Sequence, residues 1–378
     1  MNHSPDTSAP IPPTALPAFR RRLLAWYRRE KRDLDWRRTR DPYAIWISEI
    51  MLQQTRVAAV IPYYRRFLAR FPTVQHLARA RVDAVLRRWA GLGYYSRARN
   101  LHRAAKEIVA RHGGKFPRGL DDALALPGIG SYTAAAVLSI AYDQPLAVLD
   151  GNVARVLARL GAVRGDLRQP KIWRSLAASA DALLASNAAS DWNQAMMELG
   201  ATVCTPQTPR CDECPVERWC RARALGIAEE LPAARVKSKT QRITLAAAVL
   251  LDPHGRTLVL RQTDDAGALF SRMWQFPAVQ AGKQPRQDLA KLLSAHLTRV
   301  FSTFIDSGAP KMQPLDDARH TVTFREIRLA SFLLRVERLP AIKGARTPLL
   351  AELDHLPVSA ATRKIAAAAL RALKASGS

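Results

Sequence analysis

Two carboxylates stand in sequence contexts that suit acid–base chemistry. Glu49 lies in an otherwise apolar helical stretch, where burial would favour the neutral form that can donate a proton. Asp150 precedes another helical stretch, where N-capping and the helix dipole favour its ionised form. A proton donor and a carboxylate anion together are the pair that glycosidic bond cleavage uses. An exposed surface position for Glu49 and a purely structural N-cap at Asp150 are the alternatives.

The four cysteines of the chain all fall within one short segment. Their spacing is Cys204-x6-Cys211-x2-Cys214-x5-Cys220. Four clustered thiolates can surround a single metal centre, and both zinc and iron–sulfur clusters accept four Cys ligands. Structural zinc commonly uses two Cys-x2-Cys pairs, whereas this segment contains only one. From the residues alone, both zinc and an iron–sulfur cluster remain open. Arginines near the ligands would offer a basic face to phosphates.

A glycine-containing turn stands between two helical patterns at residues 126–133. Gly128 and Gly130 allow a tight turn, and their bare backbone allows a phosphate to approach closely. The next helix is expected to begin at about Ser131, so its first N–H groups would point at the same place and favour an anion. This pattern indicates a helix-hairpin-helix that holds a DNA backbone. An ordinary loop between helices is the alternative.

Composition and charge narrow the class of partner. The chain has 378 residues, with 58 Lys and Arg against 32 Asp and Glu, which gives a formal net charge of +26. This excess points to nucleic acid first and an anionic membrane surface second, although a general richness in arginine would produce it too. Residues 1–17 have no apolar core, and no apolar run of about 18 residues occurs, so we expect neither a secretory signal nor a membrane-spanning helix. We therefore expect a cytoplasmic protein.

The elements that must position these residues fall into two parts. Apolar groups at helical spacing predict helices as far as about residue 225, including 43–58 and 131–142. Beyond a polar, basic stretch, residues 243–251, 257–262 and 326–336 read as strands and 286–301 as a helix. We thus expect a multidomain fold, with an all-α domain followed by an α+β domain. The expected division is a disordered N-terminus at 1–17, a helical domain at 18–230 with a cysteine loop at 204–220, a linker at 231–240, an α+β domain at 241–367 and a tail at 368–378.

Four motifs, at residues 46–57, 91–101, 126–137 and 148–160, together with the cysteine spacing, resemble the helix-hairpin-helix DNA glycosylases. Within that superfamily, which includes endonuclease III, the chain resembles the MutY adenine glycosylases over roughly residues 20–365. The resemblance implies excision of adenine mispaired with 8-oxoguanine or guanine in duplex DNA. It implies that Glu49 protonates the adenine at N7, that Asp150 stabilises the sugar cation and that the cysteines hold a 4Fe–4S cluster.

Further roles are carried over from the resemblance position by position. Tyr132 and Asn152 fall where the family has supporting active-site residues, and Arg37 matches a position near the adenine pocket. Gln54 and Tyr94 match residues that wedge the duplex around the lesion pair, with Leu52 beside them. Relatives that resemble endonuclease III and also cut the strand place a catalytic Lys where this chain has a tyrosine. Without that amine the nucleophile for Schiff-base chemistry is lost, so we expect base excision by water.

The C-terminal part resembles the Nudix-like domain by which the family recognises 8-oxoguanine. The likeness lies in residues 258–261 and 274–277, whereas the Glu-rich helix that binds magnesium in Nudix hydrolases is absent from 278–301. The family's lesion-sensing loop reads Phe-Ser-His, and here Thr323 replaces the Ser while Phe324 replaces the His. The remaining alternatives are a pyrimidine glycosylase and lyase of the endonuclease III type, a non-catalytic iron–sulfur DNA-binding protein and a Nudix hydrolase. We expect a monomer associated with the nucleoid of a bacterial-type cell.

Overall fold

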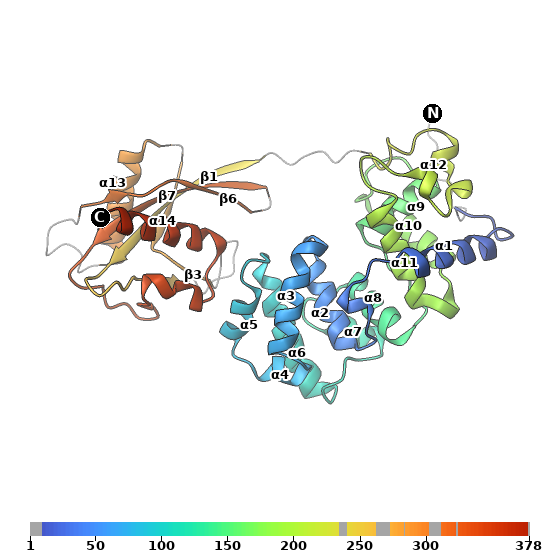
Figure 1. Cartoon of the computed structure of the whole chain (residues 1–378), viewed down its shortest axis with the longest axis horizontal. Coiled ribbons are helices and arrows are strands. Elements are labelled where there is room, and N and C mark those ends of the chain that lie inside the picture. The colour runs from blue at the N-terminus through green and yellow to red at the C-terminus, as the bar shows by residue number, and fades with distance from the viewer. Residues whose placement is uncertain are drawn as a thin grey trace. The chain divides into compact units, whose positions relative to one another are not determined.

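The computed structural model of the chain describes residues 10–233, 240–261, 273–282, 284–301, 311–322 and 324–376. The chain divides into two compact units (Figure 1). The first comprises Met1–Ala80 and Ser96–Val236, and the second comprises Arg81–Tyr95 and Lys237–Ser378. A short segment from the helical part of the sequence thus groups with the C-terminal part.

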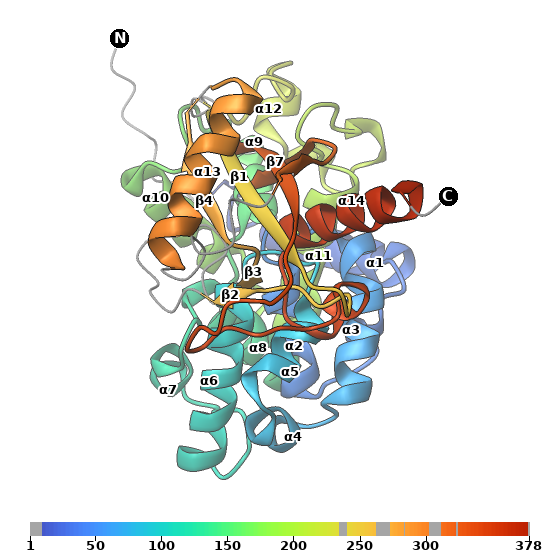
Figure 2. The same ribbon diagram turned by 90° about the vertical axis from the view of Figure 1, so that its left-hand side faces the viewer.

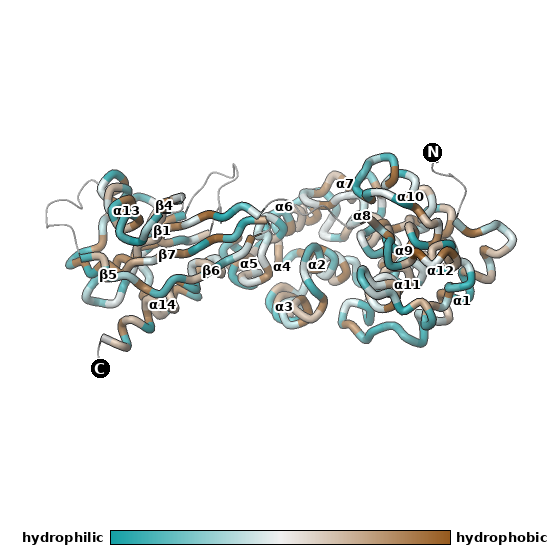
Figure 3. Tube along the Cα trace, turned by 90° about the horizontal axis from the view of Figure 1, so that it is seen from above, coloured by the Kyte–Doolittle hydropathy of each residue, from teal (hydrophilic) through white to brown (hydrophobic). Residues whose placement is uncertain are grey.

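The first unit is helical. Its helices are α1 (Leu16–Glu30), α2 (Pro42–Leu52), α3 (Val57–Arg70), α4 (Val74–Arg79), α6 (Tyr95–Arg111), α7 (Leu120–Ala125), α8 (Ser131–Tyr142), α9 (Gly151–Leu160), α10 (Pro170–Leu183), α11 (Ala189–Thr202) and α12 (Arg221–Ala224). Most are amphipathic, and the alternation of hydrophobic and hydrophilic residues along them can be followed in Figure 3.

Two helices of this unit, α2 and α8, are apolar on all sides. Residues 43–51 of α2 are all buried, as are residues 133–140 of α8. A helix that is hydrophobic all round belongs in the interior, and these two pack against each other there. Any polar side chain on α2 or α8 must therefore be buried or line a cavity. Helix α11 packs against α8, and α1 and α9 in turn pack against α11.

The second unit is α+β. Its strands are β1 (Gln241–Leu251), β2 (Leu260–Arg261), β3 (Trp274–Gln275), β4 (Ala278–Ala281), β5 (Gln313–Pro314), β6 (Ala318–Val322) and β7 (Arg325–Arg335), and its helices are α5 (Val82–Trp89), α13 (Arg286–Val300) and α14 (Ala360–Ser376). The main sheet has the order β4-β1-β7-β5, with β6 also paired to β7. The central pair β1 and β7 is parallel, while β4, β5 and β6 are antiparallel to their neighbours.

Helices cover both faces of this sheet, which explains the nearly continuous apolar sequence of β1. Side chains alternate between faces along a strand, so Ala247, Val249 and Leu251 pack into one cluster with residues of α14. Ala246 and Leu250 instead join the cluster formed by residues of α13. Figures 1 and 2 show α13 and α14 on opposite sides of the sheet.

The expected order of an all-α domain followed by an α+β domain is confirmed, but several element boundaries differ. The helix expected over 43–58 ends at Leu52, and α3 begins at Val57. Order begins before residue 18, since α1 starts at Leu16 and Ile11 is only 1% exposed. At the other end α14 continues to Ser376, through most of the expected tail.

Candidate active site

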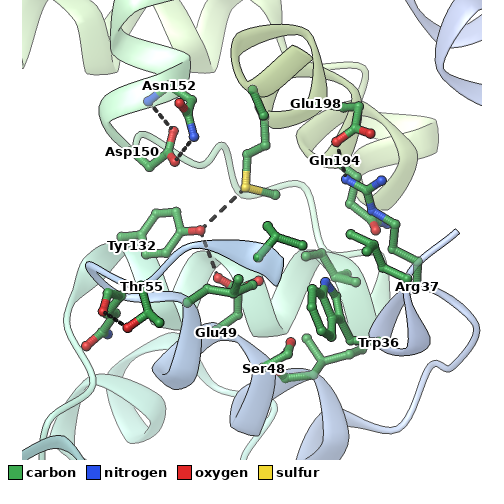
Figure 4. Close-up of a pocket in the computed structure, with 18 of the residues that line it drawn as sticks. Trp36, Arg37, Ser48, Glu49, Thr55, Tyr132, Asp150, Asn152, Gln194 and Glu198 are labelled. Carbon is green, nitrogen blue, oxygen red and sulfur yellow. Dashed lines mark hydrogen bonds and ion pairs between the residues drawn. The ribbon is translucent and has the colours of Figure 1, made fainter. Parts of the chain in front are cut away.

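The two central buried helices bring Glu49 and Tyr132 together. Glu49 is carried by α2 and is only 6% exposed. Tyr132 lies at the start of α8, and its hydroxyl donates a hydrogen bond of 2.8 Å to Oε2 of Glu49. Figure 4 shows Tyr132 between Glu49 and Asp150. The surface alternative for Glu49 is therefore wrong, because the carboxyl group lies inside the protein.

Burial raises the pKa of Glu49 to about 7. The hydrogen bond from Tyr132 works against this rise, the negative charge of Asp150 adds to it, and the guanidinium of Arg37 opposes it. A carboxyl group with a pKa near neutrality is protonated in a large fraction of molecules at pH 7. Such a group can supply a proton under physiological conditions.

Asp150 occupies the N-cap of α9. Its Oδ1 accepts from the backbone N–H of Asn152 at 2.9 Å and of Val153 at 2.7 Å, and its Oδ2 accepts from Nδ2 of Asn152 at 3.1 Å. Burial raises the pKa of Asp150, and these three donors oppose the rise. These donors stabilise the carboxylate anion against burial, which is the larger effect and keeps the pKa above its usual value, and Asn152 holds the carboxylate in place.

The two carboxyl groups line one cavity of about 490 Å³, which is within the usual range of ligand pockets. Most of the pocket and wedge residues expected from the sequence also line this cavity. Those of the expected residues that line it are Arg37, Glu49, Leu52, Gln54, Tyr132, Asp150 and Asn152. All of these belong to the first unit, so the cavity is complete within the helical part of the chain.

Glu198 also lines the cavity and was not predicted from the sequence. Glu198 lies on α11, its side chain is fully buried, and it accepts a bidentate pair of hydrogen bonds from Arg32 and a third, at 2.7 Å, from Nη2 of Arg37. Burial alone would raise the pKa of Glu198, but the hydrogen bonds from the two arginines lower it to about 2. The stretch 189–202 also contains Asp191 and Asn193, so no local pattern in the sequence distinguishes Glu198 from a surface glutamate.

The segment after α2 carries the expected wedge residues Leu52 and Gln54. Leu52 is half-buried, whereas Gln54 is exposed and has a φ of 57°. The left-handed conformation costs a residue with a Cβ about 1 to 2 kcal/mol. Tyr94, in the second unit, also has a left-handed backbone, with a φ of 47°, and 40% of its surface is exposed. Each of these side chains is therefore presented outward from a constrained backbone.

The hairpin between α7 and α8 has the expected glycine geometry. Gly128 has a φ of 78°, and a Cβ there would lie 2.6 Å from Cβ of Asn100. Gly130 is the N-cap of α8, and a Cβ there would meet nothing within 4 Å. The first glycine is thus required by the turn itself. The second leaves open space in front of the N–H groups that begin α8, as an anion site requires.

All four cysteines line one small cavity, with Arg159 in its wall. All are free thiols. Burial raises the pKa of Cys214 to about 12, and the charges of the other three cysteines raise it further. Among the described residues, no three His, Cys, Asp or Glu side chains form a group that could hold a metal ion. Four cysteine sulfurs are a donor set that both structural zinc and iron–sulfur clusters use, so the residue types fit either group.

Helix α9 joins Asp150 and Asn152 to the cysteine segment through two buried arginines, Arg155 and Arg159. Arg155 donates to Oδ1 of Asn152 at 2.9 Å and to the backbone oxygen of Cys204 at 2.8 Å. Arg159 donates to Sγ of Cys204 at 3.1 Å, to the oxygen of Thr205 at 2.7 Å and, through Nε, to the oxygen of Leu231 at 2.8 Å. The helix that Asp150 caps is thereby anchored on the segment that carries the thiols.

Phe324, one of the two expected lesion-sensing residues, lies between β6 and β7, where the strand register pairs Val322 with Arg325. Thr323 lies outside the described residues. Phe324 is described and is 45% exposed, with the guanidinium of Arg325 at 5.3 Å from its ring centre. An exposed aromatic ring next to a cation at the tip of a hairpin is suited to stacking on a planar group.

Comparison with known proteins relates the helical part of the chain to base excision repair proteins. Residues 47–179 match the family model of the HhH-GPD superfamily base excision DNA repair proteins. A solved structure of a thermostable thymine-DNA glycosylase has a TM-score of 0.51 and 28% sequence identity, and the likeness covers 56% of this chain and 98% of that one.

No described helix is both long and apolar enough to cross a membrane.

Comparison with curated proteins narrows this class. An adenine DNA glycosylase of Mus musculus is 35% identical over 401 residues, which covers 92% of this chain and 77% of that relative. One of Homo sapiens is 50% identical over 215 residues, which covers 54% of this chain but only 39% of that relative. The chain belongs to the adenine DNA glycosylase family. The family expected from the sequence is therefore confirmed.

Proposed function

We propose that the chain is a monofunctional DNA glycosylase that excises adenine mispaired with 8-oxoguanine or guanine in duplex DNA. One observation supports this most strongly. A buried Glu49 with a pKa of about 7, held by Tyr132, shares a cavity with an Asp150 that is surrounded by donors. One group is suited to giving a proton and the other to remaining an anion, which is the division of labour that N-glycosidic bond cleavage needs.

In the proposed reaction, Glu49 donates its proton to N7 of the adenine, so that the base leaves as a neutral molecule when the bond from sugar C1′ to N9 breaks. The positive charge left on the sugar is stabilised by Asp150. Water then adds to C1′, and the proton that it releases restores the acid form of Glu49. The product is an abasic site, and no strand is cut.

The absence of a lyase step follows from what lines the cavity. Among its described lining residues there is no lysine, and Tyr132 stands where a Schiff-base amine would be expected. Without a neutral amine to attack C1′, the sugar cation has only water as its nucleophile. This distinguishes the proposed activity from a pyrimidine glycosylase with lyase activity.

A base inside a duplex must be extruded before any group in this cavity can reach it, which costs a few kcal/mol of unstacking. We assign that work to the wedge residues Leu52, Gln54 and Tyr94, and the backbone grip to the turn containing Gly128 and Gly130. The net charge of +26 supports duplex DNA as the partner, since phosphate contacts supply most of the sequence-independent affinity. We propose that the chain works as a monomer, at the nucleoid of a bacterial-type cell.

The α+β unit is proposed to be the Nudix-like domain that recognises 8-oxoguanine opposite the target adenine. Thr323 would supply a hydroxyl at the position of the family's serine. Thr323→Ala should therefore narrow the preference for the lesion pair over the A·G pair, measured as a ratio of single-turnover rates. An unchanged ratio of the two single-turnover rates would refute this assignment.

We further propose that Cys204, Cys211, Cys214 and Cys220 hold a 4Fe–4S cluster. The cluster would cross-link the segment on which Arg155 and Arg159 anchor α9. Iron and sulfide analysis of the purified protein, with its visible absorbance, tests this assignment. We expect four irons per chain, following the cluster type. Stoichiometric zinc without iron would refute it.

The function itself is tested on duplexes with adenine opposite 8-oxoguanine, guanine, thymine and cytosine. We expect release of adenine from the first two only, and loss of release in both Glu49→Gln and Asp150→Asn. Borohydride should trap no covalent complex with the wild-type chain. Release of a pyrimidine, or strand nicking that borohydride traps and that Glu49→Gln abolishes, would overturn the proposal.

A further inference from the structure

Arg97, on α6, makes a concentrated set of contacts with the end of α2. Its Nη1 donates to the backbone oxygens of Ile50 at 2.8 Å, Met51 at 3.0 Å and Gln53 at 2.5 Å. Its Nη2 donates to Oγ1 of Thr55 at 3.2 Å. A cation at a helix C-terminus satisfies carbonyls that have no partner within the helix and complements the negative end of its dipole. Arg97 thus acts as a cap that is supplied by another helix.

These contacts enclose one residue on both sides. Gln54 lies between Gln53 and Thr55, both of which Arg97 contacts, and it is the residue with the left-handed φ of 57°. A second anchor comes from α8, where Oγ1 of Thr133 accepts a hydrogen bond of 3.2 Å from Nε2 of Gln53. The backbone of Gln54 is thus clamped from two helices while its side chain remains exposed.

We propose that Arg97 is a positioning residue that holds residues 53–55 in the conformation that presents Gln54 to the duplex. The inference deepens the proposed function, because it rests on Gln54 taking part in base extrusion. A left-handed glutamine is unfavourable by itself, so the conformation persists only while its surroundings over-determine it. Removing the guanidinium frees the carbonyls of Met51 and Gln53, and the segment can relax to an ordinary right-handed backbone.

A merely structural role for Arg97 makes a different prediction. If the guanidinium only stabilises the fold, its loss acts independently of the Gln54 side chain. If it positions Gln54, its loss has no further effect once that side chain is gone. A double-mutant cycle between Arg97 and Gln54 separates these cases, because non-additivity reports coupling between the two residues.

The experiment measures duplex opening, not excision, in the full-length chain carrying Glu49→Gln. Fluorescence of 2-aminopurine beside the target adenine reports the extruded state. We expect Arg97→Ala and Gln54→Ala each to lower the opening constant about tenfold, equivalent to about 1.4 kcal/mol, and the double variant to lower it no further than either single change. Arg103→Ala, which removes an exposed charge from the same helix, is the matched control and should leave opening unchanged.

Losses that multiply to about a hundredfold in the double variant would overturn the proposal, as would an unchanged opening constant in Arg97→Ala. If Arg97→Ala does not fold, Arg97→Gln, which keeps two amide donors, takes its place in the same cycle. The result is independent of the proposed function. A wild-type chain that opens the duplex but releases no adenine refutes the function and leaves the assignment of Arg97 to be decided by the cycle.

Discussion

The hydrogen bond between Tyr132 and Glu49 tunes the pKa of the proposed acid, and Tyr132→Phe removes it together with the longer contact, of 3.4 Å, from the same hydroxyl to Sδ of Met197. The bond, of 2.8 Å, favours the ionised form of Glu49 and so lowers its pKa relative to burial alone. A hydrogen bond to a charged group contributes roughly 1.5 to 3 kcal/mol, and one pKa unit corresponds to about 1.4 kcal/mol. The pKa of Glu49 should therefore rise by about one to two units in the variant.

The sign of the effect on activity follows from the role of Glu49. The acid works in its protonated form, so excision should slow as pH rises through the pKa of about 7 in the wild-type chain. In Tyr132→Phe the falling limb of the profile should move to higher pH by about one to two units. At alkaline pH the variant should consequently retain a larger share of its maximal rate than the wild type does.

The assay is single-turnover excision of adenine opposite guanine, with DNA saturated by protein, at closely spaced pH values. Tyr142→Phe is a matched control, because this tyrosine lies on the same helix but donates to the backbone oxygen of Phe116, away from the cavity. Its profile should coincide with that of the wild type. An unshifted limb in Tyr132→Phe, or one moved to lower pH, would refute the assignment of Glu49 as the acid.

Three further outcomes are expected. Glu49→Gln should gain stability relative to wild type as pH rises from 4.5 to 7, by about 3 kcal/mol, because the folded wild-type chain binds the Glu49 proton more tightly than the unfolded chain does. Thermal melts of both chains test this, and a difference in melting temperature that stays constant across that pH range would contradict the raised pKa of Glu49. Glu198→Gln should destabilise the fold by about 3 to 5 kcal/mol at pH 7, since Arg37 loses a buried partner, and the difference should shrink as pH falls from 4.5 towards 2. A variant with the same melting temperature as the wild type would contradict the buried pairing. Gly128→Ala should lower both the melting temperature and the DNA affinity, whereas Gly130→Ala should lower the DNA affinity alone. Equal effects of the two variants on both properties would contradict the separate roles given to these glycines.

The chemistry-bearing residues were largely predictable because they lie next to local patterns. Glu49 interrupts an apolar helical stretch, and Asp150 precedes one, so their burial and capping follow from their neighbours alone. The turn at Gly128 and a strand at 326–336 were predictable for the same reason, but the parallel pairing of β7 with β1 was not. The structure adds that one cavity contains both carboxyl groups, which no local pattern can state.

What the sequence did not reveal depends on long-range partners. Glu198 reads as an ordinary helical glutamate until Arg32 and Arg37, far away in the chain, are seen to enclose it. The end of α2 at Leu52 was missed because the polar residues 53–56 span only about one helical turn before apolar residues resume at Val57. The cation that supports this end, Arg97, comes from another helix. In both cases an arginine distant in sequence determines the local conformation.

The anchoring of α9 has a consequence for how the protein matures. The guanidinium of Arg159 lies in the interior, and the partners of its nitrogen atoms, Cys204, Thr205, Pro206 and Leu231, all follow it by more than 40 residues. A growing chain cannot satisfy this buried cation until the whole cysteine segment has been synthesised and folded. The final position of the helix capped by Asp150 therefore depends on residues that are translated after it.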